Sequence, residues 1–383
     1  MAVYPAGIAT PSAPTRRPGS DRRCGIDDVR QRRSHTRDLG QAATGVIVTG
    51  SDVVGAAIVY ALARNNIRVT CIDLEVHGAG VAGSAFGWIG TAPTGLQLHR
   101  DAIADFHALD TDLGGAPSVS WAGSLTWLRT PEDTESFVRT QQGLGFPTEA
   151  VDAEGFTRLE PTLGSRPEIA AYAPHEGSVA PGRIRRTLLA AAQAHGARVV
   201  EAAVSEIAVG SDARAQVFSD AGVLHARYVV LANGLGVPRL AAQVGTVLAV
   251  ESAPAIRYAF RTSAQLSRRV LSGPDYEIRP WHRGAYLGAE SYTATDDPYR
   301  PVRRVHRALE AIRRDFGLRN ALELMDLRVG FRPMPTADRP YLGTLPTAPQ
   351  VLVACMHSGV TLAPAAARRV LHHILGTAEL ASI

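Results

Sequence analysis

The sequence contains no lysine, so all 40 of its basic side chains are arginines. Without a lysine, the chain cannot form the Schiff base that binds pyridoxal phosphate. It also cannot build a P-loop, in which a lysine contacts the terminal phosphates of a nucleotide. The absence therefore excludes both of these enzyme classes, even if a coding bias towards arginine is its cause.

Cysteine is scarce, and Cys24, Cys71 and Cys355 show neither C-x-x-C spacing nor a paired framework. Cys71 and Cys355 lie in apolar runs typical of strands, so we expect buried, unreactive thiols and a cytoplasmic protein. The 12 histidines are scattered, and the one close pair, His372 and His373, faces different directions on a helix. We therefore expect no metal site.

Aromatic residues make up 6% of the chain and do not alternate with basic residues, which argues against a surface that stacks nucleic-acid bases. The net charge of +4 arises in residues 1–44, which hold eight arginines and four aspartates, whereas the remainder has 32 basic and 32 acidic residues. We therefore expect neither nucleic acid nor membrane as a partner. Scattered prolines and the lack of apolar periodicity predict that residues 1–44 are a disordered tail.

Long apolar runs are almost absent, and one candidate for a membrane span covers residues 42–63. Asp52 lies in the middle of this run, where a bilayer would oppose it by ~3 kcal/mol. Three glycines interrupt the run, and a charged strand pattern follows it. We therefore favour a strand and a helix over a signal or anchor segment. An organellar address and an early start codon are alternatives for residues 1–44.

Residues 45–75 read as a nucleotide-binding βαβ unit. A short apolar strand at 46–49 is followed by a helix at 53–63, rich in Ala and Val, and by a second strand at 68–72. A tight turn that begins at Gly50 connects the first strand to the helix. This order is typical of the first unit of a dinucleotide-binding domain.

The unit matches a dinucleotide fingerprint except at the middle glycine. The motif G-x-G-x-x-G binds a pyrophosphate at the start of the helix, and an acid follows about 20 residues later. Gly50, Gly55 and Asp73 match this pattern, whereas Asp52 stands at the middle glycine. That glycine normally lets the backbone approach the pyrophosphate, so Asp52 adds both bulk and negative charge there.

The remainder of the chain alternates between α/β blocks and β-rich inserts. Helical patterns cover residues 97–113, 182–195, 302–315 and 362–375, and Gly196 is the C-cap of the second. Strand patterns cover residues 121–128, 197–204, 204–209, 215–219, 227–231, 247–252, 255–260, 276–280, 285–290 and 351–356. This order predicts a mixed α/β (α+β) fold with one discontinuous nucleotide domain and one interleaved substrate domain.

Four segments, in this order and spacing, resemble the FAD-dependent amino-acid and amine oxidoreductases of the D-amino-acid oxidase superfamily, glycine oxidase and sarcosine oxidase among them. The first two are the βαβ unit and GSAFGWIG at 83–90. The third is HEGSVAPGRIRRTLLAAAQAHGARVVE at 175–201, which leads to VVLANGLGV at 229–237. The fourth is the pair GFRPMPTADRPYLG at 330–343 and CMHSGVTLAP at 355–364. The resemblance covers about residues 45–378.

The resemblance implies a Rossmann-like FAD-binding domain with an interleaved antiparallel-sheet substrate domain. The FAD-binding domain would comprise residues 45–98, 175–245 and 326–383, and the substrate domain residues 99–174 and 246–325. The FAD would be noncovalent, because Gly330 and Phe331 stand where relatives with covalent flavin have a cysteine.

The resemblance also implies the residues that hold FAD. Asp73 would accept hydrogen bonds from the adenosine ribose, and the backbone N–H groups of Gly359, Val360 and Thr361 would face the flavin C2 carbonyl. An ordinary helix start with Thr361 as N-cap is the alternative for this segment. The expected cofactor-binding residues are Gly50, Asp52, Val53, Val54, Gly55, Asp73, Leu74, Gly83, Ser84, Val204, Ala232, Asn233, Gly234, Ser358, Gly359, Val360 and Thr361.

Arg332 matches the arginine that grips the substrate carboxylate in amino-acid-oxidising relatives. A guanidinium suits this role because it forms two parallel bonds to a carboxylate, and a structural ion pair is the alternative. Tyr276, Arg279 and His282 lie on the insert expected to cover the flavin, and sheet surface is the alternative for them. The candidate catalytic residues are Arg332, Tyr276 and His282.

The predicted reaction oxidises the C–N bond of a small-molecule amino acid or related amine, with hydride transfer to FAD. Sarcosine-oxidase-like relatives are thought to activate oxygen with a lysine, so its absence favours another electron acceptor. Asp52 raises the alternative of a flavin-free relative that acts as a binding or interaction module, and an NAD-dependent dehydrogenase is a third reading. His357 and Ser358 lack a nucleophile-elbow context, so we assign them no nucleophilic role. The sequence does not indicate the oligomeric state.

Overall fold

The computed structural model describes residues 44–75, 81–91, 97–282, 284–291, 299–320, 322–336 and 339–383. Residues 38–383 form one compact unit, and the boundaries of the two predicted domains within it stay a prediction. The predicted tail and Cys24 lie outside the described residues. None of the described helices is long and apolar enough to cross a bilayer, and the apolar run at 42–63 contains a strand and a helix.

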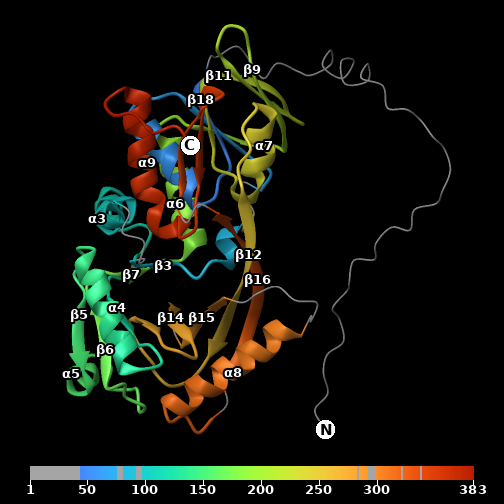
Figure 1. The fold of residues 1–383 in the computed structure, drawn as a ribbon. Helices are drawn as coiled ribbons and strands as arrows, with labels where there is room; N and C mark the ends of the chain where they lie inside the picture. The colour runs from blue at the N-terminus through green and yellow to red at the C-terminus, as the bar shows by residue number, and fades with distance from the viewer. Residues whose placement is uncertain are drawn as a thin grey trace, which may run out of the picture. The chain divides into compact units, whose positions relative to one another are not determined.

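One eight-stranded sheet, here called the nucleotide sheet, contains the predicted βαβ unit (Figure 1). Its strands are β1 (Thr44–Thr49), β2 (Val69–Asp73), β8 (Arg198–Glu201), β9 (Val204–Val209), β10 (Ala215–Ser219), β11 (Gly222–Leu231), β17 (Tyr341–Leu345) and β18 (Ala348–Cys355). The order is β17-β18-β11-β1-β2-β8, and β10 and β9 extend from β11 as an antiparallel meander. All pairs from β18 to β8 are parallel, which confirms the expected architecture.

Helices cover both faces of the nucleotide sheet (Figure 1). They are α2 (Val53–Arg64), α3 (Gln97–Asp112), α6 (Pro181–Ala194), α7 (Val237–Gln243) and α9 (Gly359–Leu375). α2 packs against α6 and α9 on one face, and α7 packs on the other. β1 is buried on both sides, with Val46 and Val48 towards α2 and Ile47 towards α7, so it reads as an unbroken apolar run.

A second eight-stranded sheet, here called the substrate sheet, is largely antiparallel. Its strands are β4 (Ser124–Thr126), β5 (Glu149–Asp152), β6 (Ile169–Ala173), β12 (Val250–Arg261), β13 (Val270–Ser272), β14 (Glu277–His282), β15 (Ala285–Ser291) and β16 (Glu323–Pro335). The order is β16-β12-β15-β14-β13-β4-β6-β5, and the pair of β13 with β4 is parallel. The antiparallel character of the inserts is thus as predicted.

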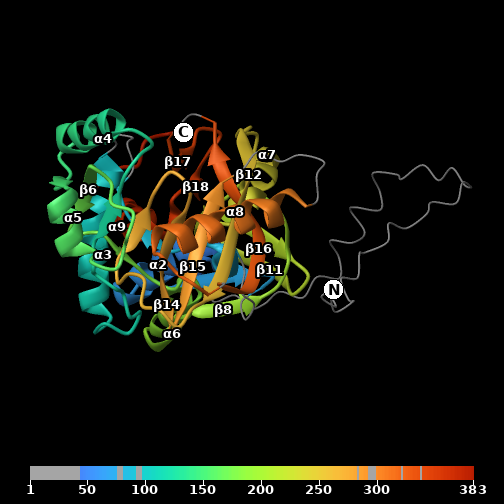
Figure 2. The same cartoon turned by 90° about the horizontal axis from the view of Figure 1, so that it is seen from below.

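One helix covers a face of the substrate sheet (Figure 2). This helix, α8 (Arg300–Asp315), shares a buried cluster with the sheet, in which Val305 and Ile312 join Tyr258 and Phe260. The remaining described elements are α4 (Pro131–Gly143), α5 (Ala153–Leu159), the paired strands β3 (Trp88–Ile89) and β7 (Gly177–Ser178), and the short helices η1 (Val81–Ser84) and η2 (Gly234–Gly236).

Two strands predicted at residues 247–252 and 255–260 are one continuous strand, β12. Pro254, which lies between the two predicted strands, has no N–H group to donate to a sheet. In the structure Pro254 pairs with Phe331 of β16, and within the described chain β15 pairs with β12 only from Ala255 onwards. Pro254 therefore lies where the described sheet has a neighbour on one side, a position that tolerates the missing donor.

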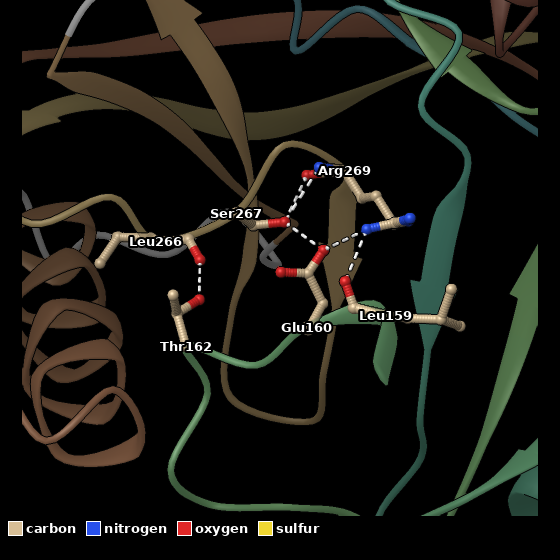
Figure 3. A network of polar contacts seen from close by, with 6 residues as sticks. All are labelled: Leu159, Glu160, Thr162, Leu266, Ser267 and Arg269. Atoms are coloured by element: carbon tan, nitrogen blue, oxygen red, sulfur yellow. Dashed lines mark hydrogen bonds and ion pairs between the residues drawn. The ribbon is translucent and has the colours of Figure 1, made fainter. Parts of the chain in front are cut away.

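A buried ion pair fastens the end of α5 to the segment between β12 and β13 (Figure 3). Glu160 accepts hydrogen bonds from Ser267 Oγ at 2.8 Å and from Arg269 Nη1 at 3.0 Å, and Arg269 also donates to the Leu159 carbonyl. Burial raises the pKa of Glu160, whereas the bonds from Ser267 and Arg269 lower it. Each charge thus compensates the other for lost hydration.

We expect Glu160→Gln to lower the free energy of unfolding by about 3 kcal/mol, because it leaves Arg269 without its counter-charge. The matched change Glu154→Gln removes an exposed ion pair with Arg158 and should cost ~0.5 kcal/mol or less. Urea titrations of both variants and the unmodified protein measure the difference. Equal losses in the two variants would contradict the assigned role of Glu160.

Candidate active site

The loop after β1 lies in close backbone contact with two other segments. Gly50 has a φ of +97°, and a Cβ on it would lie 2.6 Å from the Ala232 carbonyl oxygen. A Cβ on Gly55 would lie 2.0 Å from the Gly50 carbonyl oxygen. Real Cβ atoms do not approach other atoms so closely, so both positions require glycine. The first and third fingerprint glycines therefore allow α2 to pack against the loop and against the turn after β11.

Asp52 is the N-cap of α2. Its backbone is extended, with φ −67° and ψ −179°, so the position does not need glycine for its conformation. Its carboxylate accepts a 2.8 Å hydrogen bond from the Val53 N–H. Aspartate is favoured at this position because its charge faces the positive end of the helix dipole. Asp52 thus uses part of the anion-binding capacity that a glycine would leave for a ligand.

A buried arginine that the sequence analysis missed holds the same loop. Arg185 of α6 is 3% exposed and donates from Nε to the Ser51 carbonyl at 2.8 Å. Its Nη2 donates to Ser51 Oγ at 2.7 Å and to the Glu75 carbonyl at 2.6 Å. Asp73 Oδ2 accepts from Ser51 N at 2.6 Å and from Ser51 Oγ at 2.7 Å. The positive charge of Arg185 therefore lies beside the loop that carries Asp52 and beside Asp73 at the end of β2, and offsets part of their charge.

The carboxyl ends of β2 and β8 bring together three of the predicted cofactor-binding residues. Asp73 ends β2, and Leu74 follows with a side chain that is 61% exposed. Asp73 Oδ1 lies at the exposed edge and makes a long 3.5 Å contact with the Glu75 N–H. Asp73 pairs with Glu201 of β8, and Val204 begins the next strand. Nucleotides bind beside such strand ends in parallel sheets.

The turn after β11 connects the first strand to the substrate sheet. Ala232 N donates to the Thr49 carbonyl at 2.8 Å, and Thr49 Oγ1 donates to Asn233 Oδ1 at 3.4 Å. Gly234 has a φ of +56°, and the nearest atom to a Cβ on it would be Pro333 Cγ of β16 at 3.8 Å. The turn therefore offers the small-residue surface expected for it.

α9 begins at Gly359, three residues before its predicted start, so Thr361 is not its N-cap. The N-cap is Ser358, which has the left-handed φ of 57° and makes no capping bond with its side chain. Leu362 N donates to the Ser358 carbonyl at 3.0 Å. The N–H groups of Gly359, Val360 and Thr361 precede this bond and lie at the positive end of the helix dipole. The correction moves them from a preceding loop into the first turn.

Glu176 is the centre of a buried polar network that the sequence analysis also missed. Its carboxylate, 2% exposed, accepts hydrogen bonds of 2.6–2.8 Å from Trp88 Nε1, Thr91 N, Thr91 Oγ1 and Ser124 Oγ. Burial raises its pKa, and these donors lower it. Thr361 Oγ1 donates to the Trp88 carbonyl at 3.2 Å. The network therefore fixes the first turn of α9 through residues 88–91.

One face of the substrate sheet meets η1 and the loop that follows it. A Cβ on Gly330 would lie 2.7 Å from Ser84 Cβ, so β16 passes close to the end of η1, which contains Gly83 and Ser84. Arg279 of β14 donates from Nε to the Phe86 carbonyl at 2.5 Å. Arg279 is 3% exposed and thus ties the sheet to this loop instead of lining a pocket.

Arg332 lies on the same face, because it follows Gly330 by two residues on β16. Its Nε is buried and has no hydrogen-bond partner among the described residues. Burial lowers the pKa of the guanidinium, and the charge of Glu277 opposes this shift. Arg332 therefore presents an unused donor on the face that meets η1.

The structure does not bring the two other candidate catalytic residues to Arg332. Tyr276 is 3% exposed and packs edge-on against Trp127 in the cluster beneath α8. His282 is exposed, contacts Trp281 in a tilted arrangement with ring centroids 4.0 Å apart, and lines an open cavity of ≈ 670 Å³. Strand pairing places it at the opposite end of the substrate sheet from Arg332.

His357 shares the electrostatic environment of Arg332, although the sequence analysis assigned it no role. Partial desolvation, the positive charge of Arg332 and the charge of His99 together lower the pKa of His357 to about 4. Burial also lowers the pKa of His99, which is 5% exposed. His357 is therefore neutral at neutral pH, and Arg332 is the positive charge of this region.

The described residues fit FAD. The close approaches at Gly50 and Gly55 pack α2 against the loop after β1 with no side chain between them, and Asp73 presents a carboxylate oxygen at the edge where a ribose binds. The first-turn N–H groups of α9 lie at the positive end of their helix, as an electron-rich ring would require. Asp52 is the one residue of this set whose charge opposes the phosphates. Bound FAD supplies the hydride acceptor, and the chain supplies binding and orientation.

Comparisons with known proteins agree with this description. A family model described as FAD dependent oxidoreductase (DAO) matches residues 45–372. Glycine oxidase of Geobacillus kaustophilus (strain HTA426) is 26% identical over 344 residues, which cover 83% of this chain and 89% of that protein. The family match confirms the resemblance and the FAD cofactor, and the comparisons do not support the flavin-free alternative.

Solved structures share the fold. The crystal structure of glycine oxidase from Geobacillus kaustophilus superposes with a TM-score of 0.77 at 24% identity, covering 87% of this chain and 95% of that chain. The crystal structure of L-proline dehydrogenase from P. horikoshii superposes with a TM-score of 0.78 at 19% identity, covering 88% and 95%. The mixed α/β fold class is thereby confirmed.

We expect Asp52→Gly to tighten FAD binding about tenfold, equivalent to ~1.4 kcal/mol, because it removes a negative charge and frees the Val53 N–H. Titration of the apoprotein with FAD, followed by flavin fluorescence, measures the dissociation constant. Asp52→Asn removes the charge but keeps the size of the side chain, so it separates the two effects. A gain in FAD affinity that is due to charge should be smaller in high salt. Weaker FAD binding in both variants would show that the carboxylate supports the cofactor.

We expect His357→Asn to reduce the loss of stability on mild acidification. The folded-state pKa of about 4 is below the ordinary 6.5, so protonation favours the unfolded chain. The contribution of neutral His357 is complete above pH 6.5 and is lost as the pH falls towards 4. Melting temperatures at pH 7.5 and 5.0 measure the effect, with the exposed His225→Asn as control. An unchanged acid shift in His357→Asn would contradict the lowered pKa of this imidazole.

Proposed function

Because the chain belongs to the family of FAD dependent oxidoreductases, we propose that it oxidises the C–N bond of a small amino acid whose carboxylate is bound by Arg332. One observation carries the role of Arg332, namely its buried Nε without a partner on the face that meets η1. A buried guanidinium is costly unless an anion completes its hydrogen bonds. A carboxylate does so with two parallel bonds.

The residues around Arg332 would position the substrate and the cofactor relative to each other. Gly330 brings β16 against Ser84 of η1, a predicted cofactor-binding residue, and Arg332 follows on the same strand. One rigid strand would therefore position both the substrate and the cofactor. A carboxylate held at Arg332 restricts where the α-carbon can lie, which favours reaction by orientation. The N–H groups at the start of α9 would stabilise negative charge at the adjoining end of the cofactor.

The relatives support a small amino acid as the substrate. The protein from Geobacillus kaustophilus is named glycine oxidase, and a structure that shares the fold is named iminodiacetate oxidase. Both names denote compounds with a carboxylate next to a C–N bond. The absence of lysine supports an electron acceptor other than oxygen, and Gly330 and Phe331 support noncovalent FAD.

Anaerobic reduction of the bound flavin tests the proposal. Small amino acids, glycine and iminodiacetate among them, and amines without a carboxylate are mixed with the purified holoenzyme, and the visible flavin absorption is followed. We expect at least one amino acid to bleach the flavin. We expect Arg332→Leu to raise the amino-acid concentration needed by about 10- to 100-fold, because charge-assisted hydrogen bonds are lost.

The control for this measurement is Arg328→Leu, four residues earlier on β16, where the arginine is 49% exposed and bonds Asp326. It should leave the reduction rate unchanged. If dithionite bleaches the flavin but no amino acid or amine does, the proposed reaction is wrong. If amino acids react equally with Arg332→Leu and the unmodified protein, Arg332 does not bind the carboxylate.

A further inference from the structure

The residue after Tyr276 faces the candidate active site. Side chains alternate along a strand, so Glu277 and Arg279 point to the face opposite Ile278. Ile278 belongs to the buried cluster beneath α8, whereas Arg279 reaches the loop after η1. The pairing register from β14 through β15 and β12 to β16 gives the same assignment. Glu277 therefore lies on the face that carries Arg332.

Glu277 has a carboxylate that the described chain leaves largely unpaired. Ser272 Oγ donates to its Oε1 at 3.3 Å, a long hydrogen bond, and the salt bridges of the described residues do not include Glu277. Burial raises its pKa, Ser272 and Arg332 lower it, and Glu290 raises it further. A carboxylate can accept several hydrogen bonds, so most of this capacity is unused. Partial burial makes a cationic partner favourable.

Glu277 and Arg332 together match the two charges of an amino acid. The charge of each shifts the pKa of the other, yet no direct ion pair joins them in the described structure. A zwitterion carries its ammonium and its carboxylate on one carbon and can bridge such a pair. We propose that Glu277 binds the protonated amino group of the substrate while Arg332 binds its carboxylate. This inference rests on the proposed function and narrows its substrates to zwitterionic amino acids.

The opposite charges of Glu277 and Arg332 would select ligands by charge. A carboxylate without an amino group gains the attraction of Arg332 but meets the like charge of Glu277. An amine without a carboxylate is attracted by Glu277 but repelled by Arg332. Glu277 would also accept a proton from the bound ammonium at Oε, which leaves the neutral amine whose lone pair oxidation of the C–N bond requires.

A pair of matched ligands tests the inference on the holoenzyme. 2-Aminoisobutyrate has no α-hydrogen and cannot be oxidised, and pivalate replaces its amino group with a methyl group of similar size. Dissociation constants for both come from the change in the visible flavin spectrum. We expect Glu277→Gln to weaken 2-aminoisobutyrate about 10- to 100-fold while pivalate binds as well or better, because the lost bond is charge-assisted. The rate of flavin reduction by glycine should fall in parallel.

Two further variants separate recognition from folding. Glu277→Asp keeps the charge and should recover part of the affinity for 2-aminoisobutyrate. Glu149→Gln makes the same chemical change at an exposed position on β5 of the same sheet and should alter neither ligand. An equal effect of Glu277→Gln on both ligands, or an effect on neither, overturns the inference. If no amino acid reduces the unmodified enzyme, the proposed function fails; if glycine reduces Glu277→Gln and the unmodified enzyme equally, this inference alone fails.

Discussion

The arrangement of the site depends on the contact between Gly55 and the carbonyl oxygen of Gly50, where a single Cβ would lie at 2.0 Å. Because no side chain intervenes, α2 starts directly on the loop that follows β1. This contact fixes the position of Asp52 as the N-cap of α2, and the hydrogen bonds from Arg185 to Ser51 hold the same loop from α6. The fingerprint survives without its middle glycine because the other two glycines carry the packing, whereas the middle position has an ordinary extended backbone.

The two sheets meet through buried polar groups as well as apolar ones. Arg279 ties the substrate sheet to the loop after η1, and Glu176 gathers donors from Trp88, Thr91 and Ser124. Burial alone would destabilise both charges, so the hydrogen bonds that complete them also fix the segments that supply them. Arg279 thereby holds the substrate sheet and Glu176 the segment that contacts the start of α9, which suits a reaction in which the protein mainly positions its partners.

The sequence predicted the elements with strong local signals and missed relations between distant segments. The βαβ unit, α6 and α8 follow from apolar periodicity and turn residues. The start of α9 was placed too late because Ser358 adopts a left-handed conformation that no local pattern indicates. Arg185 and Glu176 escaped notice because an isolated charge in a sequence does not reveal its partners. Tyr276 was a candidate because it lies on the insert expected to cover the flavin, whereas the pairing of β14, which the sequence does not reveal, decides which side chains share a face with Arg332.

The turn before β14 therefore has a significance beyond its length. Gly273 N and the Tyr276 carbonyl close it with a 2.9 Å hydrogen bond, and its residue count sets the phase of the strand. Loss or gain of one residue there would turn the Tyr276 phenol towards the face that carries Arg332 and would bury the Glu277 carboxylate under α8. A one-residue insertion or deletion in this turn would thus exchange a carboxylate for a phenol on that face, without any point substitution. An alignment that matches residue types across this turn would then equate two sites that have different side chains on this face.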